Sequence, residues 1–254
     1  MGRLEGLVTV VTGAGSGIGA ASALAFAREG AAVLVADVSG DSAERTATDI
    51  RSAGGAAEEI AIDVTDNEQV ERMLQAAVDR FGKLDVLFNN AGVPQSFTPF
   101  EESTDALYDR IFDVNVRGVF YGCRAAIPHL KQNGGGVILN TASTAGIRPR
   151  PGLAVYNASK AAVINLTKTL AVELAPHRIR VVSLCPVATD TPMLPGFIGP
   201  TTDEAAARQR FIATIPWGRL NRAEDLANAA VFLVSPEAEM VTGTAFEVDG
   251  GRDV

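Results

Sequence analysis

Short runs of β-branched and aliphatic residues alternate along the chain with longer segments in which apolar residues recur every three or four positions. Side chains repeat with a period of about 2 in a strand and about 3.6 in a helix, so the short runs predict strands and the longer segments predict amphipathic helices. The alternation extends over the whole sequence. It is typical of repeated strand–helix units around a parallel sheet that is buried on both faces.

The pattern predicts seven strands and six helical segments. The predicted strands are Leu7–Val11, Ala32–Ala36, Ala57–Ile62, Val86–Asn89, Val137–Asn140, Arg180–Leu184 and Ala245–Val248. The predicted helices are Ile18–Arg28, Ser42–Ser52, Asn67–Arg80, Thr104–His129 with a break inside it, Tyr156–Ala175 and Ala223–Leu233. The expected fold is α/β, with a doubly wound, seven-stranded parallel sheet and helices on both faces.

Residues 1–254 are predicted to form a single domain, because no proline-rich linker or charge run divides the sequence. A stretch rich in proline and glycine, residues 187–216, follows the sixth predicted strand. Ligands of open α/β sheets bind outside the carboxyl ends of the strands, so this stretch is expected to be a mobile substrate lid. The alternative is a surface loop without a function.

Composition excludes several classes of protein. A formal net charge of −8 without a cluster of basic residues argues against a nucleic-acid surface. The two cysteines, Cys123 and Cys185, have neither disulfide-framework nor zinc-ligand spacing, so no metal is expected. The sequence has neither a signal-peptide pattern nor an apolar stretch long enough to span a bilayer. We therefore expect a cytoplasmic protein without a membrane partner.

The segment Thr12–Gly19 follows the first predicted strand directly and contains four glycines. Glycines allow a tight turn, and the exposed N–H groups at the start of the next helix stabilise a phosphate charge. The residues predicted to hold a dinucleotide here are Gly13, Ser16, Gly17, Ile18 and Gly19. A glycine-rich turn alone is weak evidence.

Asp37 ends the second predicted strand, 18 residues beyond Gly19. A carboxylate at this place can accept hydrogen bonds from both ribose hydroxyls of an adenosine and would repel a 2′-phosphate. Neither Ser16 nor Val38 offers a cationic partner for such a phosphate. NAD is therefore favoured over NADP.

Polar or glycine-containing clusters also follow the third and fourth strands, at Asp63-Val64 and Asn89–Gly92. The carboxyl ends of parallel strands meet at one edge of a sheet, so these clusters predict a continuous dinucleotide site.

Tyr156 and Lys160 are four residues apart on a predicted helix, and Ser143 lies thirteen positions upstream. Positions i and i+4 share a helix face, so the ammonium of Lys160 is expected near the Tyr156 phenol. A nearby positive charge favours a phenolate and lowers a phenol pKa that is ordinarily about 10. In isolation, this spacing describes an ordinary Tyr and Lys on a helix.

Together, these motifs resemble the short-chain dehydrogenase/reductase family over nearly the full length of the chain. The matching elements are Thr12-Gly-x-x-x-Gly-Ile-Gly19, Asn89-Asn-Ala-Gly92, Asn115, Ser143, Tyr156-x-x-x-Lys160 and Val248-Asp-Gly-Gly251. The resemblance implies a single Rossmann domain that transfers a hydride between a nicotinamide and an alcohol or ketone. It also implies a homotetramer.

The resemblance implies a role for each matched residue. Tyr156 would exchange a proton with the substrate oxygen, and Ser143 would donate a hydrogen bond to it. Lys160 would hold the nicotinamide ribose and lower the pKa of Tyr156, while Asn115 would position a water. The remaining cofactor contacts would come from Asp37, Asp63 and Val64 at the adenosine end, Asn90, Ala91 and Gly92 in the middle, and Pro186, Val187, Thr189 and Thr191 near the carboxamide. Many family members have Gly where this chain has Val187, which adds bulk at the nicotinamide pocket.

The substrate is expected to contact mostly apolar side chains, namely Gln95, Ala145, Leu153, Val187, Met193 and Phe197. None is cationic, which favours a neutral secondary alcohol or ketone, although Arg148 and Arg150 lie close by in sequence. Two alternatives stay open. The first is an NADPH-dependent 3-oxoacyl reductase, which Asp37 disfavours. The second is a non-enzymatic NAD(H)-binding regulatory protein, and the complete set of Ser143, Tyr156 and Lys160 counts against it because a sensor does not need an activated phenol.

Overall fold

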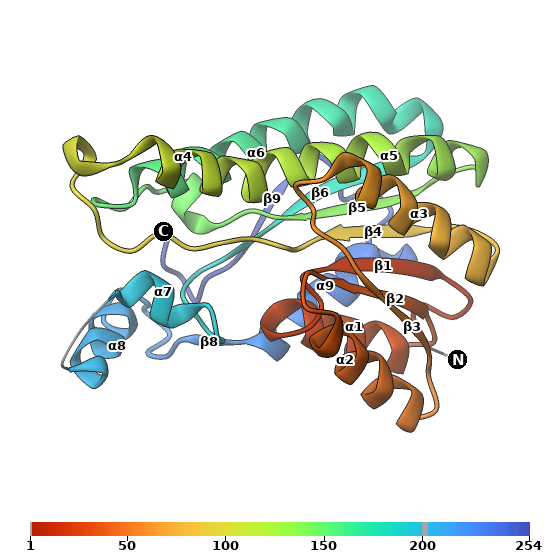
Figure 1. The fold of residues 1–254 in the computed structure, drawn as a ribbon, viewed down its shortest axis with the longest axis horizontal. Coiled ribbons are helices and arrows are strands. Elements are labelled where there is room, and N and C mark those ends of the chain that lie inside the picture. The colour runs from red at the N-terminus through yellow and green to blue at the C-terminus, as the bar shows by residue number, and fades with distance from the viewer. Residues whose placement is uncertain (1, 200–202) are drawn as a thin grey trace.

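The computed structural model describes residues 2–199 and 203–254. Pro200, which falls in the predicted lid stretch, lies outside the described residues. A seven-stranded sheet forms the centre, in the order β3-β2-β1-β4-β5-β6-β9 (Figure 1). Its strands are β1 (Val8–Thr12), β2 (Ala32–Asp37), β3 (Ala56–Ala61), β4 (Val86–Asn89), β5 (Gly136–Thr141), β6 (Ile179–Pro186) and β9 (Ala245–Val248). Every predicted strand is present, and the fold class is confirmed.

All neighbouring strands of this sheet are parallel. The chain begins in the middle at β1, winds outward to β3, and then returns to β4 and winds toward the opposite edge. The direction of winding reverses between β1 and β4, and this reversal opens a crevice at the carboxyl ends of the strands.

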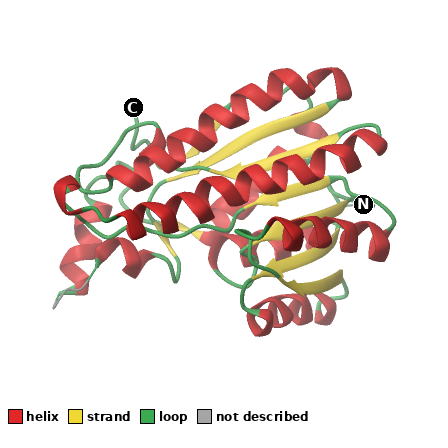
Figure 2. Ribbon diagram, turned by 45° about the horizontal axis from the view of Figure 1, so that its top comes forward, coloured by secondary structure: helices red, strands yellow, loops and turns green. Residues whose placement is uncertain are grey.

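Helices cover both faces of the sheet (Figures 1 and 2). One layer contains α1 (Gly17–Arg28), α2 (Gly40–Ser52) and α9 (Ala223–Val234), and the other contains α3 (Asn67–Phe81), α5 (Gly118–Gln132) and α6 (Ala154–Leu174). Successive residues of a strand point to opposite faces of the sheet. Val11 packs in the core with α1, α2 and α9, and Val10 packs in the core with α3, α5 and α6. Because both faces are buried at the centre of the sheet, strands such as β1 and β4 are mostly apolar rather than alternating, whereas the edge strand β3 is partly exposed and carries two glutamates.

The long helix predicted over 104–129 changes its winding without breaking. It consists of α4 (Asp105–Phe112), a π-helical turn (Asp113–Arg117) and α5. The wider turn holds the buried Asn115. Such π turns occur often at functional sites.

The predicted lid stretch has more regular structure than its prolines suggested. It contains β7 (Thr189–Asp190), α7 (Leu194–Ile198) and α8 (Glu204–Ile212), and β7 pairs with β8 (Asn221–Arg222). Figure 1 places α7 and α8 beyond the carboxyl ends of the strands. These elements are too short to show a periodicity in the sequence, and a small apolar cluster holds them in place. Its buried members are Val187, Leu194, Ile215 and Leu220.

Short 3₁₀ turns complete the described chain, at Phe100–Glu102, Thr144–Gly146, Ala175–His177 and Pro236–Ala238. Among the described residues, no helix has both the length and the apolar character needed to cross a membrane.

Candidate active site

A cavity of about 440 Å³ opens at the carboxyl ends of the strands. It contains most of the predicted site. Among its lining residues are Gly13, Ser16, Gly17, Ile18, Asp37, Asp63, Val64, Asn90, Ala91, Gly92, Ala145, Leu153, Pro186, Val187, Thr189, Thr191, Met193 and Phe197. Ser143, Tyr156 and Lys160 line the same cavity. Gly19, Gln95 and Asn115 do not belong to the lining.

The glycine-rich turn is shaped by close backbone contacts. Gly13 has a φ of +63°, and a Cβ on it would lie 2.8 Å from the Cα of Ala91. A Cβ on Gly17, whose φ is +54°, would lie 3.3 Å from the Cβ of Thr191. Only glycine fits these positions without strain, so the turn presents bare backbone N–H groups to the cavity.

Gly19 does not line the cavity and has a packing role, and its contact with a cofactor stays a prediction. A Cβ on Gly19 would lie 2.2 Å from the carbonyl oxygen of Gly13. The residue therefore lets α1 pack closely against the turn that precedes it.

Asn90 connects the ends of three strands. Its side-chain nitrogen donates to the carbonyl oxygens of Thr12 (3.0 Å) and Gly13 (3.3 Å), and its Oδ1 accepts from the Thr141 hydroxyl at 3.2 Å. These bonds hold the glycine-rich turn in place relative to β4 and β5.

Asp37 lies at the adenosine end of the predicted dinucleotide site. Its carboxylate accepts hydrogen bonds from the backbone N–H groups of Gly15 and Ser39, both at 2.9 Å. The fixed carboxylate beside a bare backbone turn fits the ribose and pyrophosphate of a nicotinamide dinucleotide. Among the described lining residues the cations are Arg150 and Lys160, so no cation lines the cavity beside Asp37.

Tyr156 is the third residue of α6, and its side chain is buried. Its backbone N–H donates to the Gln95 side-chain oxygen at 2.9 Å, and the Gln95 nitrogen donates to the carbonyl oxygen of Gly152 at 3.4 Å. Both ends of Gln95 are thus bonded to backbone, and the residue is 1% exposed. The expectation that Gln95 contacts substrate is wrong: it satisfies a free N–H at the start of α6 and so positions Tyr156.

The sequence predicted that Lys160 lowers the pKa of Tyr156, but the structure shows a raised pKa. Burial raises the pKa of Tyr156 to about 12, opposed by a hydrogen bond with Ser143 and by the charge of Arg150. Lys160 extends past the ring, with Nζ 5.7 Å from the ring centroid, and donates to the carbonyl oxygen of Thr141 at 2.8 Å. Burial lowers the pKa of Lys160 to about 8. The i,i+4 spacing predicted proximity, but the end of β5 decides where the ammonium binds.

Ser143 caps the 3₁₀ turn after β5. Its hydroxyl accepts from the backbone N–H of Ala145 at 3.1 Å and donates to the carbonyl oxygen of Pro186 at 3.4 Å. Both bonds fix the hydroxyl beside Tyr156 at the floor of the cavity.

Asn115 is engaged by protein groups. Its side-chain oxygen accepts from Val93 N–H at 2.8 Å, and its nitrogen donates to the carbonyl oxygen of Val93 (3.1 Å) and to the Ser159 hydroxyl (3.3 Å). The amide therefore links the chain after β4 to α6. The water-positioning role implied by the resemblance is not carried by the side-chain amide in this arrangement.

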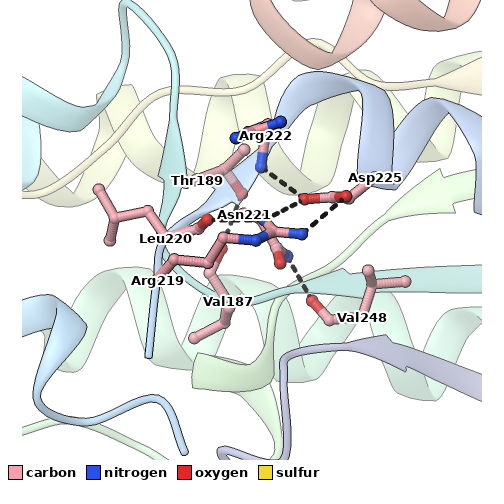
Figure 3. A network of polar contacts seen from close by, with 8 residues as sticks. All are labelled: Val187, Thr189, Arg219, Leu220, Asn221, Arg222, Asp225 and Val248. Atoms are coloured by element: carbon pink, nitrogen blue, oxygen red, sulfur yellow. Dashed lines mark hydrogen bonds and ion pairs between the residues drawn. The ribbon is translucent and has the colours of Figure 1, made fainter. Parts of the chain in front are cut away.

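A polar network holds the segment that follows β6 (Figure 3). The Asn221 N–H donates to the carbonyl oxygen of Ala188 at 3.1 Å, which continues the pairing of β7 with β8. Arg219 donates to both carboxylate oxygens of Asp225, at 2.5 and 3.1 Å, and the Arg222 N–H also donates to Asp225 at 2.8 Å. The network orients the segment that contains Val187 and Thr189.

We expect Asp225→Ala to lower the free energy of unfolding by about 1–2 kcal/mol, because both a bidentate ion pair and an N-terminal helix contact are lost. It should also weaken NADH binding, since β8 aligns the cavity wall. Urea unfolding and calorimetric titration measure the two effects. Glu237→Ala, which removes an exposed partner of Arg3, should change stability by less than about 0.5 kcal/mol. Equal losses of unfolding free energy in Asp225→Ala and Glu237→Ala would contradict the stabilising role of Asp225.

Comparison with known proteins decides the family. Residues 13–253 match the family described as enoyl-(acyl carrier protein) reductase. The chain is 43% identical over 252 residues to 4-formylbenzenesulfonate dehydrogenase of Comamonas testosteroni, covering 99% of this chain and 100% of that protein. The chain belongs to the short-chain dehydrogenase/reductase family.

Solved structures of this family share the fold. A 3-ketoacyl-(acyl-carrier-protein) reductase from Brucella melitensis, complexed with NADH, superposes with a TM-score of 0.92 at 47% identity, covering 99% of this chain and 100% of that one. A 7α-hydroxysteroid dehydrogenase complexed with NADH and 7-oxo glycochenodeoxycholic acid has a TM-score of 0.90 at 35% identity, with coverage of 98% and 95%. The protein is therefore a short-chain oxidoreductase that uses a nicotinamide cofactor.

Proposed function

We propose that the protein is an NAD-dependent oxidoreductase that transfers a hydride between nicotinamide and a secondary alcohol or ketone, with Tyr156 as the acid/base. The observation that carries the proposal is one cavity that contains a hydroxyl pair, Ser143 and Tyr156, together with the glycine-rich turn and Asp37. A dinucleotide that runs from Asp37 toward Tyr156 would bring its reactive ring to the hydroxyl pair.

When bound, the cofactor supplies or accepts the hydride. Charge then changes on the substrate oxygen, so the protein must place hydrogen-bond donors there. Ser143 and Tyr156 provide two hydroxyl groups on the same side of the cavity. In carbonyl reduction, the Tyr156 phenol would give its proton to the developing alkoxide, and burial, which raises the pKa of Tyr156 to about 12, favours this protonated form. Alcohol oxidation is the reverse transfer, in which the Tyr156 phenolate would take the proton of the alcohol.

Lys160 would hold the nicotinamide ribose, and Asp37 would hold the adenosine ribose. Thr189 and Thr191 line the cavity on the side of the segment after β6 and would contact the carboxamide and phosphates. Val187 lines the cavity and also packs in the cluster with Leu194.

The proposed substrate has an apolar body. Leu153, Met193 and Phe197 line the cavity, and the Phe197 ring meets Tyr156 edge-on at a centroid distance of 5.0 Å. The expectation of a neutral substrate depended on a pocket without cations. Arg150 lines the cavity, so that premise does not hold.

A second candidate is reduction of a 3-oxoacyl thioester. It is favoured by the 47% identity to the Brucella melitensis protein, a 3-ketoacyl-(acyl-carrier-protein) reductase whose structure was solved with NADH. Ser143 and Tyr156 would act in the same way on a thioester substrate. Rates measured with both classes of substrate therefore distinguish the two candidates.

We expect kcat/KM with NADH to exceed that with NADPH by at least about 10-fold, because Asp37 would repel a 2′-phosphate. NADH absorbance measures the rates across secondary alcohols, cyclic diols, sugars, hydroxysteroids and a 3-oxoacyl thioester. Asp37→Ala should lower the ratio of kcat/KM with NADH to kcat/KM with NADPH. A clear preference for NADPH in the unaltered enzyme would contradict the cofactor assignment, and NADH binding without turnover across the panel would favour a non-enzymatic binding protein.

A homotetramer is also part of the proposal. Phe120 on α5 and Val172 on α6 are exposed apolar residues, at 43% and 78%. They supply apolar surface on the two helices that the family resemblance places at subunit contacts.

A further inference from the structure

Arg150 precedes α6 and lines the cavity together with Leu153, Tyr156 and Phe211. Its carbonyl oxygen accepts from the side-chain nitrogen of Asn157 at 2.8 Å, and the Leu153 N–H also donates to it at 3.3 Å. The backbone of Arg150 is therefore fixed to the first turn of the helix that carries Tyr156. A group held by the Arg150 side chain would be held at a set place relative to the Tyr156 hydroxyl.

Among the residues that the structure describes, the Arg150 guanidinium has an aromatic partner but no anionic one. Its Cζ lies 5.6 Å from the centroid of the Phe211 ring. Within residues 2–199 and 203–254, no carboxylate is found within 4.0 Å of this guanidinium to form an ion pair. Arg252 and Asp253 act on it from farther away with opposite signs.

Arg148 shows the contrast. Its guanidinium donates to the carbonyl oxygen of Arg252 at 2.7 Å, and it does not line the cavity. Of the two arginines that the sequence places near the pocket, the tertiary structure directs only Arg150 into it.

A partly buried guanidinium has lost some of its bound water, and without an anion no ion pair compensates for that loss. Burial accordingly lowers the pKa of Arg150. Its planar set of N–H donors matches a carboxylate or another oxyanion in a two-pronged hydrogen bond. The surrounding Leu153, Met193 and Phe197 would meet an aliphatic or aromatic body.

We propose that the substrate carries an oxyanion group, in addition to its reacting alcohol or ketone, and that Arg150 binds this group. The inference rests on the function proposed above and narrows its substrate class. The reacting oxygen lies at Ser143 and Tyr156, the apolar body contacts Leu153 and Phe197, and the oxyanion lies toward Arg150. Hydroxy acids and keto acids with an apolar spacer fit this arrangement.

The test is calorimetric titration of benzoate and benzamide into the protein saturated with NADH. The two probes have nearly the same size and differ in charge. We expect benzoate to bind at least about 10-fold more tightly than benzamide, and Arg150→Met to weaken benzoate binding by about 10- to 100-fold, as for lost hydrogen bonds to a charged group. Met keeps an unbranched side chain against Phe211. Arg148→Met should retain the preference for benzoate.

Equal affinities for the two probes in the unaltered protein, no detectable benzoate binding, or a preference that persists in Arg150→Met would overturn the proposal. Arg150→Gln provides a second variant with a shorter polar side chain, and the comparison of probes in the unaltered protein does not depend on any variant. Binding needs no turnover. Absence of activity across the alcohol and ketone panel would therefore reject the proposed function, while the benzoate titration still decides the role of Arg150.

Discussion

Replacing Tyr156 with Phe lowers kcat by at least about 1000-fold, in the range expected when a positioned general acid is removed. The change deletes one oxygen atom and leaves the buried ring, which meets Phe197 edge-on. The backbone N–H of residue 156 keeps its bond to Gln95. NADH affinity should therefore stay within about threefold, because the ring and the helix start are preserved.

Steady-state kinetics and calorimetric NADH titration separate these two effects. Tyr108→Phe is the matched control, because Tyr108 is exposed on α4 and lies outside the described cavity lining. It should keep full turnover. If Tyr156→Phe retains substantial turnover, Tyr156 is not the acid/base.

Lys160→Met lowers kcat/KM by at least about 100-fold, because the substitution removes the cation proposed to hold the nicotinamide ribose. Nζ is buried and donates to the carbonyl oxygen of Thr141. Met cannot replace this donor or the charge, so NADH binding should weaken as well. Lys168→Met, on an exposed position of the same helix, should leave both quantities unchanged. Normal NADH affinity in Lys160→Met would contradict the assignment of Lys160 to the ribose.

The same variant has a distinct pH signature in the cofactor-free protein. Burial lowers the pKa of Lys160 from 10.5 to about 8, so between these values the unfolded chain binds more protons than the folded protein. Stability must then rise with pH in this window. From pH 7 to about 9.5, the unaltered protein should gain about 2 kcal/mol in unfolding free energy relative to Lys160→Met. Urea unfolding at the two pH values measures the difference. If the unfolding free energies of the two proteins depend on pH in the same way, the folded protein does not lower the pKa of Lys160.

The central strands could be predicted because each one is short and buried on both faces. Val10 and Val11 serve opposite helical layers, so a continuous apolar run is required and leaves a clear pattern in the sequence. The winding of parallel strands then brings their carboxyl ends to one edge. Asp37, Asn90 and Ser143 consequently meet at one cavity, as their positions after strands predicted.

The errors concern residues whose role depends on packing between elements. Gln95 follows β4 in a loop, and only the approach of α6 gives its amide two backbone partners. Gly19 belongs to the expected motif, and only the structure shows that a Cβ at this position would collide with the Gly13 carbonyl. The helices in the 187–216 stretch are too short to leave a periodic signal, and contacts with the apolar cluster around Leu194 hold them in place.

By itself, the sequence determined the α/β fold, because strand periodicity and helical spacing are local properties of the backbone. It also predicted Asp37 from its place at a strand end and the proximity of Tyr156 and Lys160 from their spacing, while the role of Ser143 is implied by the family resemblance. Only the tertiary structure decided the ionisation of Tyr156 and Lys160 and the entry of Arg150 into the cavity. Desolvation and side-chain direction depend on every element that packs around a group, and no local pattern records that sum.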